Sequence, residues 1–385
     1  MRPRVRARRG DAGVAGGRPN LTWVRALRYE AFGGPIELVD VPAPRPGTAD
    51  VVVAVTATGV CRSDWHGWQG HDSDITPPQI PGHELAGLVV EVGRDVRGWR
   101  GGERVTVPFV CACGTCAVCR SGNAQVCPNQ RQPGFTDPGS FAEQVMIPFA
   151  DANLVALPDA ISDVAAAALG CRFATSWRAV TVHGDVHPGD VVLVLGLGGV
   201  GLAAAQIARA AGARVIGLDP SPAAVAFAAT LGLTECSVLD VDAAPADVAA
   251  EVLARTGGAH VGIDAVGTPS GVATSVLSLR RRGRHVQVGL LPSAGGPVPV
   301  PMDRLISYEL ALLGSHGMPA AAYPELLAAV AAGRVDPAAL VTRRVGLTAG
   351  AAALTSMVTD PAAGITVIEP GRTDGSLGTG QTGRP

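Results

Sequence analysis

The stretch VVLVLGLGGVG, at residues 191–201, carries the strongest fold signal in the chain. Five apolar residues before a glycine cluster predict a buried strand, and the Ala-rich segment 202–211 predicts a helix after it. Glycines in the pattern Gly-x-Gly-x-x-Gly allow a tight turn and close approach of the backbone to a pyrophosphate, whose charge then lies at the helix N-terminus. The residues predicted to bind a dinucleotide there are Gly196, Gly198, Gly199 and Gly201.

The βαβ pattern continues from this stretch toward the C-terminus. Apolar strand candidates alternate with Ala-rich helical segments, and this alternation predicts an α/β fold with a doubly wound parallel sheet. The strands are expected at residues 191–195, 214–218, 237–239, 260–265 and 285–289. Residues 191–208 are uncharged and long enough for a membrane span, but their four glycines argue against one, so no membrane partner is expected.

An acidic residue ends the second predicted strand. Asp219 stands 18 residues after Gly201, where a carboxylate accepts hydrogen bonds from a ribose diol and repels a 2′-phosphate. This position favours NAD over NADP. The alternative is a glycine-rich packing turn beside a solvated acid, and the ordered succession of strand, turn, helix, strand and acid argues against it.

The region before the α/β part has a different pattern. Between residues 24 and 169, short alternating runs such as Val51, Val53 and Val55 are separated by Pro and Gly clusters, which predicts a β-rich domain. A length of 385 residues with 47% hydrophobic content is enough for two such domains, each with its own core.

Four cysteines in the β-rich region follow one another at intervals of three, three and eight residues. This spacing suits a closed tetrahedral thiolate cage around a structural zinc ion, which contributes folding energy. The expected ligands are Cys113, Cys116, Cys119 and Cys127. A group of buried thiols or a redox pair is the alternative, and Cys111 does not fit the spacing and is expected to be a spectator.

Cys61 and the triplet Gly82-His83-Glu84 indicate a second kind of metal site. Ligands scattered along the chain leave coordination positions open for water or substrate, as is typical of a catalytic zinc site. The sequence therefore predicts two metal sites with different tasks.

Charge and residue usage exclude several classes of function. The formal net charge of −2 argues against a nucleic-acid partner, and the absence of Lys excludes Schiff-base and lysine-base mechanisms. Eight cysteines without an export signal are better explained as metal ligands than as disulfides, which predicts a cytoplasmic location. The Arg-rich segment 1–20 and the Gly-, Thr- and Ser-rich segment 371–385 are predicted to be disordered tails.

Together, these motifs resemble the zinc-dependent alcohol dehydrogenases of the medium-chain dehydrogenase/reductase superfamily. The resemblance covers about residues 24–369 and rests on the triplet at 82–84, the cysteine spacing and the glycine turn. It implies a Rossmann domain inserted into a GroES-like β-rich catalytic domain. The implied division is a GroES-like domain with a structural zinc lobe at 21–172, a Rossmann NAD-binding domain at 173–308 and a return to the catalytic domain at 309–370.

The resemblance also implies a ligand set and an activity. Cys171 matches the third catalytic ligand beside Cys61 and His83, which gives two zinc ions per subunit with NAD as the cofactor. Branches of the family that act on sugars and polyols tend to have Glu at that position, so Cys favours simple alcohols. The implied reaction is hydride transfer between a primary or secondary alcohol and NAD+, or the reverse reduction of an aldehyde or ketone.

The resemblance implies further roles for residues next to the ligands Cys61 and His83. Ser63 matches the hydroxyl that takes the substrate proton, and His66 matches the exposed end of the proton relay. Asp64 resembles the carboxylate that orients the zinc-bound imidazole, and Glu84 resembles the acid that approaches the metal during ligand exchange. The acids could instead be surface charges, and His66 could be only solvated.

Contacts with the nicotinamide and with the substrate are implied by the same matching. Thr175 corresponds to the residue that touches the nicotinamide. The substrate cleft would be lined by Trp65, Trp68 and Phe109, although these aromatic residues could equally be core residues.

Two departures from the family pattern bear on cofactor and assembly. Many members place a basic residue on the pyrophosphate after a glycine near the C-terminus, but Gly364 is followed by Ile365 here, so Arg172 is an alternative phosphate contact. The segment between Cys127 and Phe141 is short, as in the microbial tetramers, which favours a homotetramer over a homodimer.

Three other hypotheses stay open from the sequence. One is a polyol, amino-alcohol or pathway-specific dehydrogenase on the same scaffold. Another is a dinucleotide-binding, zinc-stapled protein without turnover. The third is the zinc-free quinone or enoyl reductase branch, and the presence of Cys61, His83 and Cys171 argues against both the second and the third.

Overall fold

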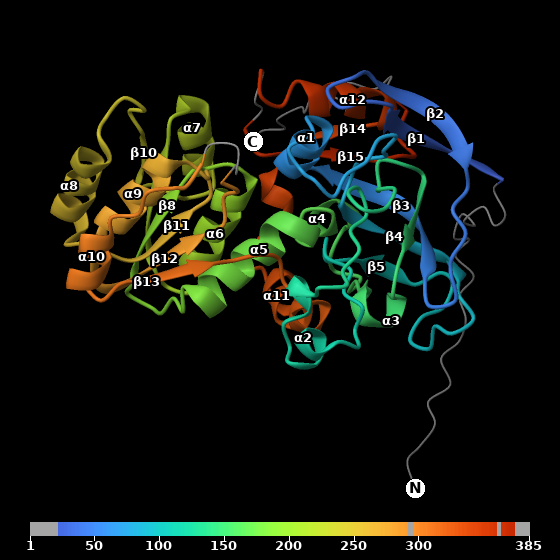
Figure 1. Ribbon diagram of the computed structural model, residues 1–385, viewed down its shortest axis with the longest axis horizontal. Coiled ribbons are helices and arrows are strands. Elements are labelled where there is room, and N and C mark those ends of the chain that lie inside the picture. Colours follow the sequence, from blue (N-terminus) through green and yellow to red (C-terminus); the bar gives the residue numbers. More distant parts are fainter. Residues whose placement is uncertain (1–21, 292–295, 360–362, 374–385) are drawn as a thin grey trace, which may run out of the picture.

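The computed structural model describes residues 22–291, 296–359 and 363–373. A parallel sheet with its helices lies beside a mostly antiparallel sheet, and α5 (Ala174–Arg178) runs between the two (Figure 1). The tail predicted at 1–20, and all but the first three residues of the tail predicted at 371–385, lie outside the described residues. No helix of the described residues is long and apolar enough to cross a membrane.

The α/β part is a six-stranded sheet in the order β10-β9-β8-β11-β12-β13, with every neighbouring pair parallel. Its strands are β8 (Val191–Leu195), β9 (Arg214–Asp219), β10 (Cys236–Val238), β11 (Ala259–Asp264), β12 (Leu279–Gln287) and β13 (Ala311–Gly314). The strand order reverses between β8 and β11, and doubly wound folds bind ligands at the carboxyl ends of the strands at such a point. The doubly wound parallel sheet predicted from the sequence is confirmed.

Helices cover both faces of this sheet. They are α6 (Gly199–Ala210), α7 (Pro222–Thr230), α8 (Pro245–Thr256), α9 (Pro269–Leu277) and α10 (Met302–Ser307). Val192 and Val194 of β8 pack into the hydrophobic cluster that contains α6, whereas Leu193 and Leu195 pack into the cluster that contains α8 and α9. Because both faces of β8 are buried, its sequence is apolar throughout rather than alternating.

The second sheet has the order β14-β15-β3-β4-β5-β7, with β6 paired to β3. Its strands are β3 (Val51–Val60), β4 (Glu84–Val92), β5 (Arg104–Thr106), β6 (Gln144–Ile147), β7 (Val155–Ala156), β14 (Val341–Val345) and β15 (Ile365–Ile368), and a hairpin of β1 (Trp23–Tyr29) and β2 (Ile36–Pro42) lies beside it. β15 pairs antiparallel with β3, with Thr366 opposite Val60. The end of the chain thus returns to the sheet where the chain began, so the parallel sheet is an insertion.

Short helices and turns connect the strands of this second part. They are α1 (Arg62–Trp68), α2 (Ala117–Arg120), α3 (Ala150–Asn153), α4 (Asp163–Ala166), α11 (Tyr323–Ala331) and α12 (Leu347–Thr355), with 3-10 turns η1 (Ala124–Val126), η5 (Ala320–Ala322) and η6 (Ala338–Leu340). The crossover into the parallel sheet is a continuous helical segment in which two π-helical turns, η2 (Leu169–Phe173) and η3 (Ala179–His183), flank α5.

The parallel sheet extends beyond the boundary predicted at residue 308. β13 pairs with β12 in parallel register, from Arg284 opposite Ala311 to Gln287 opposite Gly314. Its four-residue sequence ALLG is too short to show strand periodicity, so its place at the sheet edge is decided by pairing with β12 rather than by local propensity.

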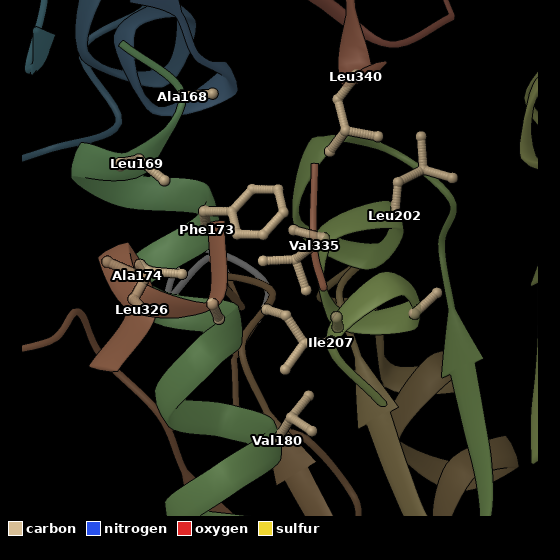
Figure 2. Packing of buried hydrophobic residues seen from close by; sticks show 14 of the residues in the cluster. Ala168, Leu169, Phe173, Ala174, Val180, Leu202, Ile207, Leu326, Val335 and Leu340 are labelled. Atoms are coloured by element: carbon tan, nitrogen blue, oxygen red, sulfur yellow. The ribbon is translucent and has the colours of Figure 1, made fainter. Parts of the chain in front are cut away.

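One core joins the crossover segment to both parts of the chain. Figure 2 shows Phe173 pointing toward Leu202 and Ile207 of α6 and toward Val335 of the returning chain. Phe173 is fully buried, and truncation of such a side chain costs about 3–5 kcal/mol. This packing fixes the crossover segment, and with it the residues at 171 and 172.

Candidate functional site

Three predicted catalytic ligands meet at the ends of two neighbouring strands. Cys61 follows β3 and His83 precedes β4, and these strands are paired with Gly59 opposite Glu84. Cys171 reaches the same place from the π-helical turn η2. The two Sγ atoms and an imidazole nitrogen all lie within 4.8 Å of one another, so the three residues can hold one metal ion.

A buried carboxylate orients His83 for that task. Asp64 accepts hydrogen bonds from His83 Nδ1 at 2.8 Å, from the Gly82 amide at 3.0 Å and from the Cys61 amide at 2.9 Å. With its proton held on Nδ1, His83 presents Nε2 as the free lone pair, and Nε2 is buried without a hydrogen-bond partner. An orphaned buried nitrogen beside two thiols fits a zinc ion, which takes both imidazole nitrogen and thiolate sulfur as ligands.

The backbone at Gly82 permits this arrangement. Its φ is +103°, and a Cβ there would collide with Phe141 and lie 2.7 Å from Ser140 Oγ. Only glycine meets both conditions, so this residue allows the chain to turn tightly before His83 enters β4.

The three ligands shift one another's pKa values. The hydrogen bond with Cys171 lowers the pKa of Cys61 well below its usual value, and the same contact raises the pKa of Cys171. Burial works to lower the pKa of His83, but the charge and hydrogen bond of Asp64 outweigh burial and raise that pKa well above its usual value. The cluster is therefore polarised toward one thiolate, the form of cysteine that binds metals.

The second predicted metal site also assembles in the structure. Adjacent sulfur atoms are 3.4 Å apart for Cys116 and Cys119, 3.5 Å for Cys113 and Cys127, 3.8 Å for Cys116 and Cys127, and 4.0 Å for Cys113 and Cys119. A tetrahedron of sulfurs with zinc–sulfur bonds of about 2.3 Å has edges of about 3.8 Å, so the four thiols fit a closed zinc cage.

Backbone amides support the cage from outside. The Cys119 amide donates to Cys116 Sγ at 3.4 Å, and the Asn129 amide donates to Cys127 Sγ at 3.4 Å. Hydrogen bonds from the Thr115 and Cys116 backbone lower the pKa of Cys113 to about 5. Cys111 is buried outside this group, where desolvation raises the pKa of its thiol.

The glycine turn lies at the carboxyl end of β8. Gly196 has φ +86°, and a Cβ on Gly201 would overlap the Gly196 carbonyl oxygen, so the close contact between turn and helix requires glycine at 201. Gly198 caps α6 without a side-chain acceptor, and the first turn of the helix contains no acidic residue. The free amide groups and the helix dipole make this terminus suitable for an anion.

Asp219 ends β9 beside the turn. Its Oδ2 accepts from the Leu197 amide at 2.6 Å and its Oδ1 from the Ser221 amide at 2.8 Å. A carboxylate has about four acceptor positions, so two remain for hydroxyl groups of a ligand. Thr175 is buried on α5, and its neighbour Ser176 donates to the Val200 carbonyl at 2.9 Å, which ties α5 to the start of α6.

Helix α1 carries the predicted proton-relay residues directly after Cys61. Ser63 Oγ lies 3.7 Å from Cys61 Sγ. His66 Nδ1 lies 3.0 Å from Nδ1 of the exposed His71, a partner that the sequence did not indicate. Burial, together with His71 and Arg62, lowers the pKa of His66.

The three aromatic residues predicted to line the substrate cleft have different surroundings in the structure. The Phe109 ring stands edge-on to His83, with centroids 6.1 Å apart. Trp65 contacts His66 and packs on the cluster around Leu27 and Phe141. Trp68 donates from Nε1 to the Gly34 carbonyl at 2.8 Å and packs on the cluster of Tyr29, Ile75 and Phe135.

Comparisons with known proteins agree with this geometry. Residues 47–159 match the alcohol dehydrogenase GroES-like domain family, and residues 199–332 match the zinc-binding dehydrogenase family. An alcohol dehydrogenase of Rhizobium meliloti (strain 1021) is 35% identical over 288 residues, which cover 74% of this chain and 81% of that protein. The chain belongs to the zinc-dependent alcohol dehydrogenase family.

Two further similarities bear on the cofactor of this alcohol dehydrogenase. An NAD-dependent alcohol dehydrogenase of Sulfurisphaera tokodaii is 30% identical and covers 90% of this chain and 100% of its own length. The crystal structure of a zinc-binding dehydrogenase from Sinorhizobium meliloti 1021 bound to NADP is 29% identical, with a TM-score of 0.78 over 91% of this chain and 100% of that chain. The chain is thus an oxidoreductase that acts on alcohols with zinc and NAD(P), as the resemblance implied.

Sequence reasoning also missed a histidine beside the site of this alcohol dehydrogenase. His316 follows β13, and its ring stands edge-on to Phe109 with centroids 5.1 Å apart, while the same Phe109 ring also stands edge-on to His83. Burial lowers the pKa of His316. No pattern in the sequence indicated His316, because β13 is too short to be recognised from its own residues.

Proposed function

We propose that the chain oxidises primary or secondary alcohols with NAD+, or reduces the corresponding aldehydes and ketones, at the site formed by Cys61, His83 and Cys171. The observation that supports this most directly is the placement of two successive residues. Cys171 points to the metal ligands, whereas Arg172 packs against Gly199 of the dinucleotide turn. Metal site and cofactor site are therefore contiguous, as hydride transfer from a metal-activated alcohol requires.

The residues around the proposed site have different roles in the reaction. When bound, zinc supplies Lewis acidity that lowers the pKa of an alcohol, and the nicotinamide supplies the hydride acceptor. Asp64 holds the Nδ1 proton of His83 and so keeps Nε2 directed at the metal position. Phe109 stands edge-on to His83 and is proposed to shield that position from water. Thr175 lies on the helix that faces the cofactor turn and is proposed to contact the nicotinamide.

The proton released by the alcohol is proposed to leave along α1. Ser63, beside Cys61, accepts it while its own hydroxyl proton moves on toward His66, and His66 passes a proton to His71 and then to solvent. Because the pKa of His66 is lowered, its imidazole is neutral and able to accept a proton at pH 7. Alcohol oxidation by the unmodified enzyme should therefore be maintained at mildly acidic pH and fall only below the usual pKa range of histidine.

His66→Ala should slow alcohol oxidation about tenfold at pH 7, since a relay residue contributes less than a full general base. The rate should recover toward pH 9–10, roughly where hydroxide replaces the imidazole as acceptor. Steady-state rates across pH check this. His71→Ala is the control, because it leaves His66 in place with access to water, and it should cause a smaller loss. A His66→Ala profile parallel to that of the unmodified enzyme would contradict the relay.

NAD is the proposed cofactor, because the carboxylate of Asp219 would lie close to a 2′-phosphate. Asp219→Asn keeps an amide oxygen for the Leu197 or Ser221 amide but removes the charge. Loss of a charged hydrogen-bond acceptor is worth about 1.5–3 kcal/mol, so kcat/KM for NAD should fall about tenfold to a hundredfold while that for NADP rises. Steady-state assays with both cofactors test this, and a preference for NADP in the unmodified enzyme would refute it.

The proposed assembly is a homotetramer with two zinc ions per subunit, and a homodimer is the alternative. β13 is an edge strand of the parallel sheet, and apolar side chains stay exposed near it, with Leu312 at 46% and Ile306 at 70% exposure. Exposed apolar surface beside an unpaired strand edge favours association. Light scattering would give four or two times 39.0 kDa.

A reducing, cytoplasmic compartment is proposed because all eight cysteines are free thiols. Six of these cysteines lie in the two metal clusters, and Cys111 is close in sequence to one cluster. Thiolate ligands persist where thiols are kept reduced.

A substrate panel tests the proposed function directly. Primary alcohols, secondary alcohols, polyols, amino alcohols and the matching carbonyl compounds would be assayed with zinc-loaded enzyme by the absorbance of NADH. The proposal expects turnover of simple alcohols or their carbonyls. Turnover confined to polyols or amino alcohols would favour the alternative dehydrogenases, and no turnover with any member of the panel would contradict the proposal.

A further inference from the structure

Arg172 is a buried cation that the mechanism above does not use. Its side chain is 7% exposed, and it binds Glu84 with both ends of the carboxylate: Nε donates to Oε1 at 3.1 Å and Nη2 donates to Oε2. The Arg172 amide also donates to Oε1 at 2.9 Å, and Nη1 donates to the Val60 carbonyl at 3.0 Å. Arg172 thus links the first residue of β4 to the last residue of β3, directly beside two metal ligands.

The other side of Arg172 faces the dinucleotide turn. A Cβ on Gly199 would lie 2.5 Å from Arg172 Cδ and 3.4 Å from both Nε and Nη1. Gly199 is the first residue of α6, whose amide groups lack a side-chain cap. The guanidinium therefore adds a full positive charge to a terminus that already favours anions.

Two of the five N–H groups of Arg172 have no acceptor among the described residues. Three are used by Glu84 and the Val60 carbonyl, which leaves one on Nη1 and one on Nη2. Unmade hydrogen bonds on a buried charged group are costly, and a phosphate at Gly199 would supply acceptors for them.

The position otherwise expected to hold a phosphate is not basic. Gly364 is followed by Ile365, and Gly364 packs against the Leu340 carbonyl and Phe227. Arg172 is instead a cation that lies against Gly199 of the turn.

We propose that Arg172 is the residue that binds the dinucleotide phosphate and connects cofactor binding to Glu84 at the metal site. The inference rests on the proposed binding of a dinucleotide at Gly196–Gly201. Glu84 and the phosphate are both anions, and they compete for the charge of one guanidinium, although the phosphate would use the N–H groups that Glu84 leaves free. A bound dinucleotide therefore weakens the attraction between Arg172 and Glu84, and by linkage Glu84 weakens dinucleotide binding by the same factor.

This competition predicts that replacing Glu84 and replacing Arg172 change the affinity for NADH in opposite directions. Glu84→Gln removes the competing charge and keeps the shape of the side chain, so NADH should bind about threefold to tenfold more tightly. Arg172→Met keeps the length and removes the charge, so NADH should bind about tenfold to a hundredfold more weakly. Arg172→Lys should lie between Arg172→Met and the unmodified enzyme, because Lys keeps the charge without the bidentate geometry.

The experiment is a titration of zinc-loaded enzyme with NADH, ADP-ribose and adenosine. Binding of NADH is measured by its fluorescence, and binding of ADP-ribose and of adenosine is measured by their displacement of bound NADH. NADH and ADP-ribose carry the pyrophosphate and should show the same order of affinities, whereas adenosine should bind all variants alike. Zinc content and thermal melting accompany each variant to show that the metal sites are intact. If Arg172→Met does not fold, the opposite shifts of Glu84→Gln and Arg172→Lys decide.

Two results would overturn the inference. Weaker NADH binding in both Glu84→Gln and the Arg172 variants would show that the ion pair only supports the fold. Equal weakening for adenosine and ADP-ribose would show that Arg172 does not contact phosphate. Failure of the unmodified enzyme to bind any dinucleotide is a separate result, because it would refute the proposed function itself.

Discussion

Replacement of Cys61 by alanine should reduce alcohol oxidation about a thousandfold or more while NADH still binds. A Lewis acid supplies several kcal/mol of transition-state stabilisation, and each 1.36 kcal/mol is a factor of about ten in rate. The dinucleotide turn has its own contacts through Asp219 and the α6 terminus, so it does not depend on the thiol. Cys171→Ala should behave in the same way.

The measurement pairs stopped-flow hydride transfer with an NADH binding isotherm on the same preparation. Cys236→Ala is the matched control, because Cys236 is a free thiol on β10 outside both metal clusters. It should keep wild-type turnover. If Cys61→Ala turned over the best substrate at the wild-type rate, hydride transfer would not need the site of Cys61, His83 and Cys171.

Replacement of Cys116 by alanine should lower the melting temperature by at least about 10 °C. Structural zinc contributes many kcal/mol to folding, and each kcal/mol shifts the melting temperature by about 2–4 °C in a domain of 150–250 residues. Cys116 contacts two other sulfurs of the cage and caps α2 by accepting from the Cys119 amide, so its loss removes a ligand and a cap together.

Metal analysis accompanies the melting curves. Zinc should fall from two ions per subunit to one, and activity should fall with the loss of the lobe structure. Cys111→Ala is the control, since Cys111 is close in sequence to the cage cysteines but lies outside the cage. This variant should keep both zinc ions. Retention of two zinc ions and an unchanged melting curve in Cys116→Ala would contradict a structural zinc cage.

Much of this architecture was predictable because it follows from local patterns. The strand and turn at 191–201 carry their own periodicity, and the cysteines of the cage are close in sequence, so spacing alone reflects their geometry. The catalytic ligands are spread over more than a hundred residues, and Cys171 was assigned through the family resemblance rather than through spacing.

What the sequence did not reveal depends on contacts between distant segments. Glu84 and Arg172 are 88 residues apart, and each alone has the pattern of an ordinary surface charge. His316 reaches Phe109 only because β13 joins the edge of the parallel sheet, and β13 is too short to be recognised alone. Trp68 was predicted by matching to line the cleft, and the sequence did not indicate its indole hydrogen bond with the Gly34 carbonyl.

The pairing of β15 with β3 has a consequence for synthesis on the ribosome. Val60 stands next to Cys61, yet its partner Thr366 is made roughly 300 residues later, which takes about 15–60 s at 5–20 residues per second. The four-cysteine lobe needs only residues 113–127 and can take up zinc as soon as it emerges. Metal loading should thus occur in two stages, with the lobe filled first and the reactive centre completed only after β15 has been made and has paired with β3.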